Sequence, residues 1–223
     1  MTIAGTVNKT GILLLCTIAT AAWTWNRFLH SESPQSVMPL AALGLIGGLV
    51  VAIVTVFKKN WSPITAPLYA LLEGLVLGAV SAIFEVRYPG VPIQAVSLTF
   101  GVLIVLLMAY RSGLIPVTDK LRIGIVAATG GIALFYLAQF ILGFFGIHFT
   151  SINNSSPIGI GFSILVVIIA SLNLVLDFDF IERGARGGAP KYMEWYGAFG
   201  LMVTLIWLYL EMLRLLGKIR DRR

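Results

Sequence analysis

The amino-acid sequence predicts an all-α integral membrane protein built as a bundle of seven transmembrane helices. Of its 223 residues, 58% are hydrophobic and 12% are charged, whereas a soluble domain carries about 25% charged residues. The apolar residues gather in seven runs, and a helix needs about 20 residues to cross the hydrocarbon core of a bilayer. Lipid is therefore the expected solvent for most of this chain.

The seven predicted helices follow one another with short connections, which leave no room for a soluble domain. They comprise approximately residues 11–28, 37–57, 65–84, 93–110, 123–147, 157–181 and 193–216. The first run resembles a secretory signal, but it lacks a clean small-residue cleavage site and further spans follow it. We therefore expect residues 1–223 to form a single transmembrane domain.

Small residues in the predicted helices indicate close packing between helices. The second helix contains Gly44, Gly47 and Gly48, the third contains the GxxxG motif of Gly74 and Gly78, and the fifth contains Gly130 and Gly131. Apolar burial alone does not favour helix association in lipid, so residues that let two backbones approach become important. We expect these glycines to lie at helix contacts.

Lysine and arginine residues predict the orientation of the bundle, because cytoplasmic loops are enriched in them. The N-terminal side carries nine: Lys9, Lys58, Lys59, Arg111, Lys120, Arg122, Arg183, Arg186 and Lys191. Before the tail, the opposite side carries only Arg27 and Arg87. The N-terminus is therefore predicted to be cytoplasmic. The basic C-terminal tail opposes this pattern, so the last helix either spans or is re-entrant, and we expect it to span.

Composition also excludes several function classes. The net charge of +6 could suggest nucleic-acid binding, but the sequence has no basic patch interleaved with aromatic residues. The single Cys16 excludes an intrachain disulfide. We find no constellation of histidine, acid and thiol and no metal-ligand spacing. We therefore expect neither an enzyme nor a bound cofactor, and the lipid bilayer as the main partner.

Carboxylates at membrane depth are candidate functional residues, because each costs roughly 2.5–3.5 kcal/mol to insert. Steps of three and four residues along the sixth helix trace a small or polar face that includes Asn173 and Asp177. Asp179 lies about 200° away, in line with Ile164 and Val175, which we expect to face lipid. Asp177 is therefore predicted to point into the bundle, as a functional acid or as a structural hydrogen-bonding group, and Asp179 to reach the cytoplasmic headgroups.

Three glutamates complete the set of candidate acids. Glu73 lies near the middle of the third helix without a charged partner on that helix, which favours a conducting or proton-relaying role. Glu194 lies in the first turn of the seventh helix, where a negative charge also complements the helix dipole. Glu211 lies further along the same helix, and an i,i+3 pair with Arg214 is the structural alternative to a functional role.

Three of the candidate acids belong to short sequence motifs, and a fourth motif lies at the end of the predicted fourth helix. They are Glu73-Gly74-Leu75-Val76-Leu77-Gly78, Tyr110-Arg111-Ser112-Gly113, Leu174-Val175-Leu176-Asp177 and Leu208-Tyr209-Leu210-Glu211. With the order of the seven predicted helices, they resemble the Bax-inhibitor-1 family, the transmembrane Bax-inhibitor-motif proteins, over nearly the whole chain, and most of all its bacterial branch. The resemblance implies six helices around a central seventh, in the inner membrane of a bacterial cell.

The same resemblance implies an activity, a pH-dependent calcium leak gated by a hydrogen-bonded pair of acids in the last two helices. On motif match Asp177 is the first acid and Glu211 the second. The depth of each acid along its helix gives a different partner for Asp177. If the sixth helix ends near Glu182, Asp177 lies about 7 Å inside that end. Glu194 then lies about 5 Å along the seventh helix and Glu211 about 30 Å along it. The partner of Asp177 stays open between the two glutamates.

The resulting hypothesis is a pH-sensitive calcium leak channel. Two carboxyls held close together share a proton and keep the helices closed; once ionised, they repel each other and offer oxygen ligands to calcium. Asp177 would then be a transient calcium ligand, with Glu73, Asn173 and Asp179 along the ion pathway. Two alternatives remain: a calcium/proton exchanger that uses the same acids, and a non-conducting membrane regulator of a protease or another partner.

Overall fold

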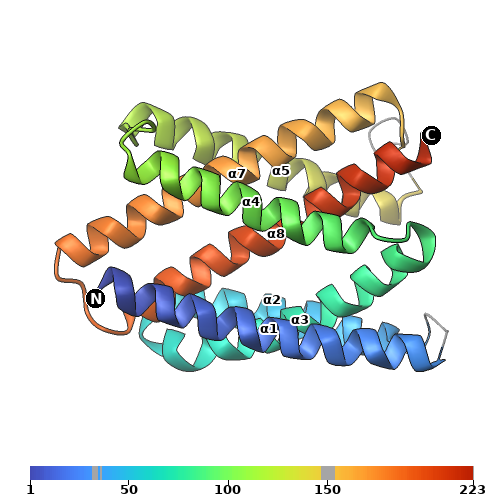
Figure 1. The fold of residues 1–223 in the computed structure, drawn as a ribbon, viewed down its shortest axis with the longest axis horizontal. Helices are drawn as coiled ribbons and strands as arrows, with labels where there is room; N and C mark the ends of the chain where they lie inside the picture. Colours follow the sequence, from blue (N-terminus) through green and yellow to red (C-terminus); the bar gives the residue numbers. More distant parts are fainter. Residues whose placement is uncertain (32–34, 36, 147–153, 223) are drawn as a thin grey trace. The chain divides into compact units, whose positions relative to one another are not determined.

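The computed structural model describes residues 1–31, 35, 37–146 and 154–222, in which no β-strand occurs. Seven of the helices in these residues are long and apolar enough to cross a membrane (Figure 1). They are α1 (Ile3–Ser31), α2 (Met38–Phe57), α3 (Ser62–Arg87), α4 (Val91–Arg111), α5 (Asp119–Phe144), α7 (Pro157–Arg186) and α8 (Met193–Asp221), and the 3-10 helix η2 (Lys59–Trp61) precedes α3. The predicted fold class, a seven-helix all-α membrane protein, is confirmed.

Most helices extend beyond the predicted apolar segments. α1 begins at Ile3 rather than at residue 11, and α7 ends at Arg186 rather than at residue 181. Ion pairs one turn apart support the added residues of α7, since Arg183 pairs with Asp179 and Arg186 with Glu182. α5 ends at Phe144, earlier than the predicted residue 147, which lies outside the described residues.

A glycine turn ends α7 and determines where α8 begins. Gly188 has a φ of +63°, in the left-handed region that glycine adopts without a steric penalty. The amide of Ala189 donates to the carbonyl of Gly184 at 3.0 Å, and the amide of Gly188 donates to that of Ala185 at 3.3 Å. This pattern is a Schellman motif, so the link between α7 and α8 is short and hydrogen-bonded.

α8 is a continuous helix of 29 residues, long enough at 1.5 Å per residue to cross a core of about 30 Å. Its most apolar stretch is 61% buried, the largest share among the seven described spans. A helix that is buried on most sides belongs in the interior of a bundle. Both properties agree with a spanning last helix rather than a re-entrant one.

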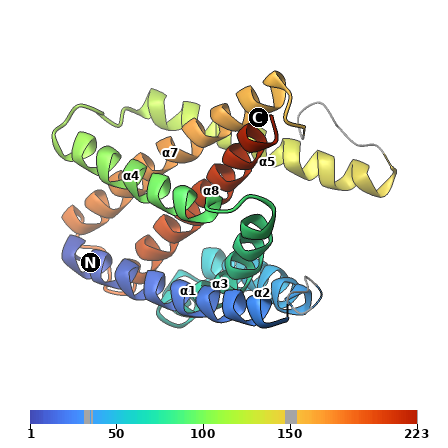
Figure 2. The ribbon, with the colours of Figure 1, turned by 45° about the vertical axis from the view of Figure 1, so that its right-hand side comes forward.

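The described chain divides into two compact units, of which the first comprises residues 1–92 and 177–203. Its helices α1, α2 and α3 lie side by side in two views (Figures 1 and 2). A Cβ atom added at Gly44 would lie 2.5 Å from the carbonyl oxygen of Leu72, and one at Gly78 would lie 2.3 Å from that of Ala21. These glycines therefore permit close approach of the helix backbones, as predicted. A Cβ at Gly130 or Gly131 of α5 would meet nothing within 4 Å among the described residues, so the close contact expected at those two glycines is not found there.

Gly78→Ala is expected to lower the free energy of unfolding by about 1–3 kcal/mol, because the added methyl group meets backbone atoms of α1 that cannot move alone. Gly101→Ala in α4 is the matched control, since a Cβ there meets nothing within 4 Å and alanine is the better helix former. Thermal unfolding of the purified variants compares the two. Equal melting temperatures would contradict the close packing of α1 on α3.

The second unit comprises residues 93–176 and 204–223, and so contains most of α4, α5, the larger part of α7 and the C-terminal part of α8. The rings of Phe135 and Phe162 pack α5 against α7 with centroids 5.2 Å apart. The ammonium of Lys218 donates to the carbonyl of Gly159 at 3.0 Å and to the hydroxyl of Ser163 at 2.9 Å. Because the start of α7 thus meets the end of α8, these two helices are antiparallel.

Candidate functional site

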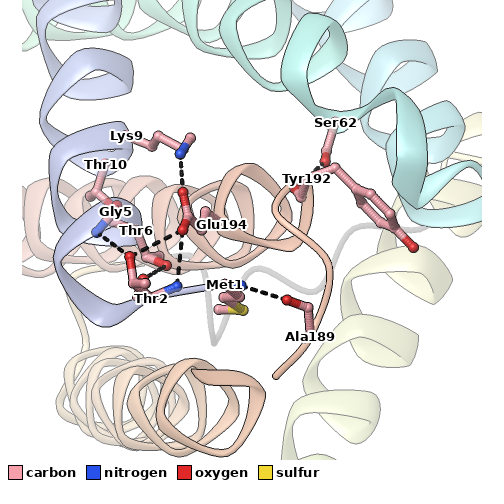
Figure 3. A network of polar contacts seen from close by, with 10 residues as sticks. All are labelled: Met1, Thr2, Gly5, Thr6, Lys9, Thr10, Ser62, Ala189, Tyr192 and Glu194. Atoms are coloured by element: carbon pink, nitrogen blue, oxygen red, sulfur yellow. Dashed lines mark hydrogen bonds and ion pairs between the residues drawn. The ribbon is translucent and has the colours of Figure 1, made fainter. Parts of the chain in front are cut away.

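Glu194 belongs to the first turn of α8 and lies next to the N-terminal end of α1. Its hydrogen bonds form a network that ties α1 to the start of α8 (Figure 3). The residue is 3% exposed. Its Oε1 accepts hydrogen bonds from the backbone amide of Thr2 at 2.9 Å and from the Thr2 hydroxyl at 3.1 Å. Its Oε2 accepts from the ammonium of Lys9, with which Glu194 forms an ion pair. Both carboxylate oxygens are therefore occupied.

The role of Lys9 differs from the one predicted. The sequence places Lys9 in an N-terminal loop, as one of the cations that set the orientation. The structure places it inside α1, with a side chain only 14% exposed. Its ammonium also lies 5.5 Å from the ring centroid of Trp195. The ammonium of Lys9 is thus largely buried and pairs with the carboxylate of Glu194.

Asp177 points toward α8, as its helical face predicts, and meets that helix at Gly200. A Cβ at Gly200 would lie 3.5 Å from Oδ1 of Asp177. Because α7 continues to Arg186, Asp177 lies about 14 Å from the helix end rather than about 7 Å. Gly200 lies about 9 Å beyond Glu194 along α8. Glu211 lies about 17 Å beyond Gly200 in the other direction, so Asp177 is level with neither glutamate.

Glu73 lies between α2 and α3 in the first unit. A Cβ at Gly48 would lie 3.0 Å from Oε1 of Glu73, so the missing side chain at Gly48 makes room for the carboxylate. Tyr69, one turn earlier in α3, forms a side-chain hydrogen bond with Glu73. The ring of Tyr69 packs edge-on against Phe199 of α8 with centroids 5.0 Å apart. Glu73 is thus linked through Tyr69 to α8.

The two remaining residues of the predicted ion pathway have polar partners of different kinds. The side-chain amide of Asn173 donates to the Thr129 hydroxyl and to the Ile169 carbonyl, both at 2.8 Å, and so links α7 to α5. Asp179 pairs with Arg183 near the end of α7; their side chains are 13% and 51% exposed. The exposed guanidinium agrees with the predicted position of Asp179 near the rim.

Glu211 is the buried carboxylate of the second unit and is 2% exposed. Its Oε1 accepts hydrogen bonds from the Tyr136 hydroxyl at 3.1 Å and from the Arg214 guanidinium at 2.7 Å. The i,i+3 pair with Arg214, which the sequence offered as the structural alternative to a functional role, is therefore present. Oε2 is also buried and accepts no hydrogen bond from the described part of the chain. A buried oxygen without a hydrogen bond is costly, which makes Oε2 the unusual atom of this site.

Tyr136 is the member of this site that the sequence analysis missed. Its hydroxyl donates to Glu211 and accepts from Arg214 at 2.6 Å, so it completes a three-residue cluster on α5 and α8. A signal was available, because a tyrosine inside an apolar span needs a hydrogen-bonding partner for its hydroxyl. The partner could not be predicted, since it lies 75 residues away in the chain.

Seven apolar helices that carry buried carboxylates define a multi-pass membrane protein. The family described as Bax inhibitor 1 like matches residues 1–221. The chain belongs to this family, as its motifs predict. Comparison with curated proteins and with solved structures gave no match.

Proposed function

We propose that the protein lets calcium ions leak down their gradient across its membrane, and that protonation of Asp177 and Glu211 closes the leak. The proposal goes further than membership of the family. It rests on the chemistry available to the acids that the helices bury.

The observation that carries the proposal is the environment of the Glu211 carboxylate. One oxygen is held by Tyr136 and Arg214, while the other is buried and without a partner in the described chain. In the proposed gating step a proton adds at Oε2, where it displaces no hydrogen-bond donor of the described chain, and it weakens the ion pair of Oε1 with Arg214.

Glu194 fits the role of second acid less well. Both of its oxygens accept hydrogen bonds, and one of them is paired with an ammonium group. Both glutamates have a charge-assisted bond, but a proton added to Glu194 would also displace a hydrogen-bond donor from an occupied oxygen, whereas Oε2 of Glu211 accepts none within the described chain. Contacts and motif therefore both favour Glu211, and they favour a structural role for Glu194.

In the proposed mechanism, low pH closes the leak and high pH opens it. Neutral, protonated carboxyls can form hydrogen bonds that keep the helices together. Ionised carboxylates repel other anionic groups and supply the oxygen ligands that calcium prefers. Asp177 then acts as a transient calcium ligand, and Glu73, Asn173 and Asp179 are proposed to line the pathway. Calcium is the cargo, and no resident cofactor is invoked.

We also propose that the protein resides in the inner membrane of a bacterial cell with its N-terminus in the cytoplasm. The exposed cations Lys58, Lys59 and Lys191 support this orientation. They lie in connections on the same side of the spans as the N-terminus, and cytoplasmic loops are enriched in such residues.

Asp177→Asn is expected to remove the pH dependence of calcium flux, because asparagine has a similar shape but cannot ionise. Flux into proteoliposomes with a trapped calcium indicator should rise from mildly acidic to mildly alkaline buffer for the wild type. For the variant it should stay about constant. Asp119→Asn is the control, because the Asp119 side chain is 92% exposed and its charge is already solvated.

An Asp177→Asn variant with the pH response of the wild type would exclude Asp177 as a gating residue. Two further outcomes would assign a different function. Proton movement driven by a calcium gradient would indicate exchange in place of leak. Purified protein that is folded but conducts no calcium would indicate a non-conducting regulator.

A further inference from the structure

The connection between α2 and α3 docks against the link between α7 and α8. The hydroxyl of Ser62, which is 0% exposed, donates to the carbonyl oxygen of Tyr192 at 2.9 Å (Figure 3). The ammonium of Lys59 lies 5.3 Å from the ring centroid of Tyr196. Two connections that are distant in sequence therefore form one surface at this end of the first unit.

This surface carries positive charge that no carboxylate in the described residues balances. The acids Asp179, Glu182 and Glu194 pair with Arg183, Arg186 and Lys9. Lys58, Lys59 and Lys191 are exposed and form no ion pair within the described chain. We call these three lysines the basic patch. Its charge is available to an anionic partner.

Large apolar side chains flank the basic patch and place it at the edge of the hydrocarbon region. Phe57, Trp61 and Ile64 are 80%, 54% and 77% exposed. Tryptophan is enriched where the hydrocarbon core meets the headgroups, and the apolar spans of α2 and α3 begin or end at these residues. The lysine ammonium groups can therefore reach the depth of lipid phosphates while the apolar groups contact acyl chains.

We propose that the basic patch binds the headgroup of an anionic phospholipid. Each ammonium offers three donors to phosphate oxygens, and basic residues near a membrane surface attract anionic lipids. The flanking apolar residues argue for a lipid as the ligand, because free phosphate gains nothing from them. Because Lys59 lies over the ring of Tyr196 and Lys191 directly precedes Tyr192, a bound headgroup lies beside the contact of Ser62 with Tyr192.

A titration of the purified full-length chain in detergent with short-chain phosphatidylglycerol, followed by native mass spectrometry, tests the proposal. We expect Lys58→Gln/Lys59→Gln to bind this lipid about 25-fold more weakly, at about fivefold per lysine. The matched control is Arg111→Gln/Lys120→Gln, which removes the same charge from the second unit. It should bind like the wild type, and added salt should weaken wild-type binding.

The site would be overturned if both double variants lost affinity equally, since net charge alone would then explain binding. Equal affinity for zwitterionic phosphatidylcholine would also overturn it. Competition by inorganic phosphate at concentrations similar to those of the lipid would assign a free-anion site instead. The variant Lys58→Gln/Lys59→Gln/Lys191→Gln provides a second measurement, with a further loss of about fivefold expected.

Discussion

Replacement of Glu211 by glutamine is expected to abolish most of the pH dependence of calcium flux and to leave the fold intact. Glutamine keeps an oxygen that can accept from Tyr136 and Arg214, which hold Oε1 in the native protein. It cannot exchange a proton at the position of Oε2, which is buried and unpartnered within the described residues. Flux into proteoliposomes in acidic and alkaline buffer should therefore differ little for this variant.

Glu194→Gln is the matched comparison, because it makes the same chemical change on the same helix. The carboxylate of Glu194 has partners at both oxygens, so its replacement should lower stability while the pH response of the flux persists. The reverse result, with the pH response lost in Glu194→Gln and kept in Glu211→Gln, would make Glu194 the second gating acid.

Lys9→Met is expected to destabilise the protein by about 3–5 kcal/mol, the usual cost of removing one partner from a buried ion pair. Methionine has a similar length but leaves the carboxylate of Glu194, 3% exposed, without its cation. Lys120→Met is the control, since Lys120 is exposed and lies outside the basic patch, and such surface changes usually lie within about 0.5 kcal/mol. Thermal unfolding in detergent measures both.

A double variant separates loss of the ion pair from loss of packing. Lys9→Met/Glu194→Gln removes both charges, and replacing both partners costs less than stranding one. It should therefore be more stable than Lys9→Met alone. A Lys9→Met variant as stable as Lys120→Met would show that the ion pair does not tie α1 to the start of α8.

The number of helices could be predicted because a bilayer imposes one length on every span and seven apolar runs meet it. The inward direction of Asp177 could also be predicted, since helical spacing places it on a face of small and polar residues. Less could be said of apolar positions. Ile164 is 44% exposed as expected for a lipid-facing residue, but Val175, predicted to face lipid, is 0% exposed. On a helix that is apolar on most sides, hydrophobicity alone does not show whether a given side chain contacts another helix or lipid.

The ends of the helices and the long-range hydrogen-bond partners could not be predicted from the sequence. The apolar run of α7 stops at charged residues, which is why the sequence predicted the helix end there. The helix in fact continues to Arg186, and i,i+4 ion pairs between these charged residues support its last turns. That extension places Asp177 at the level of Gly200, about 9 Å from Glu194 and about 17 Å from Glu211 along α8, so depth pairs it with neither glutamate. The contacts of Lys9 with Glu194 and of Tyr136 with Glu211 join residues 185 and 75 positions apart, and local patterns carry no information about such pairs.

Calcium entry into liposomes that contain the purified wild-type protein is the most direct test of the proposed leak. The rate should exceed that of protein-free liposomes, and it should increase when the buffer is changed from mildly acidic to mildly alkaline. A rate equal to that of protein-free liposomes, or one that falls as the pH rises, would contradict a leak that protonation closes.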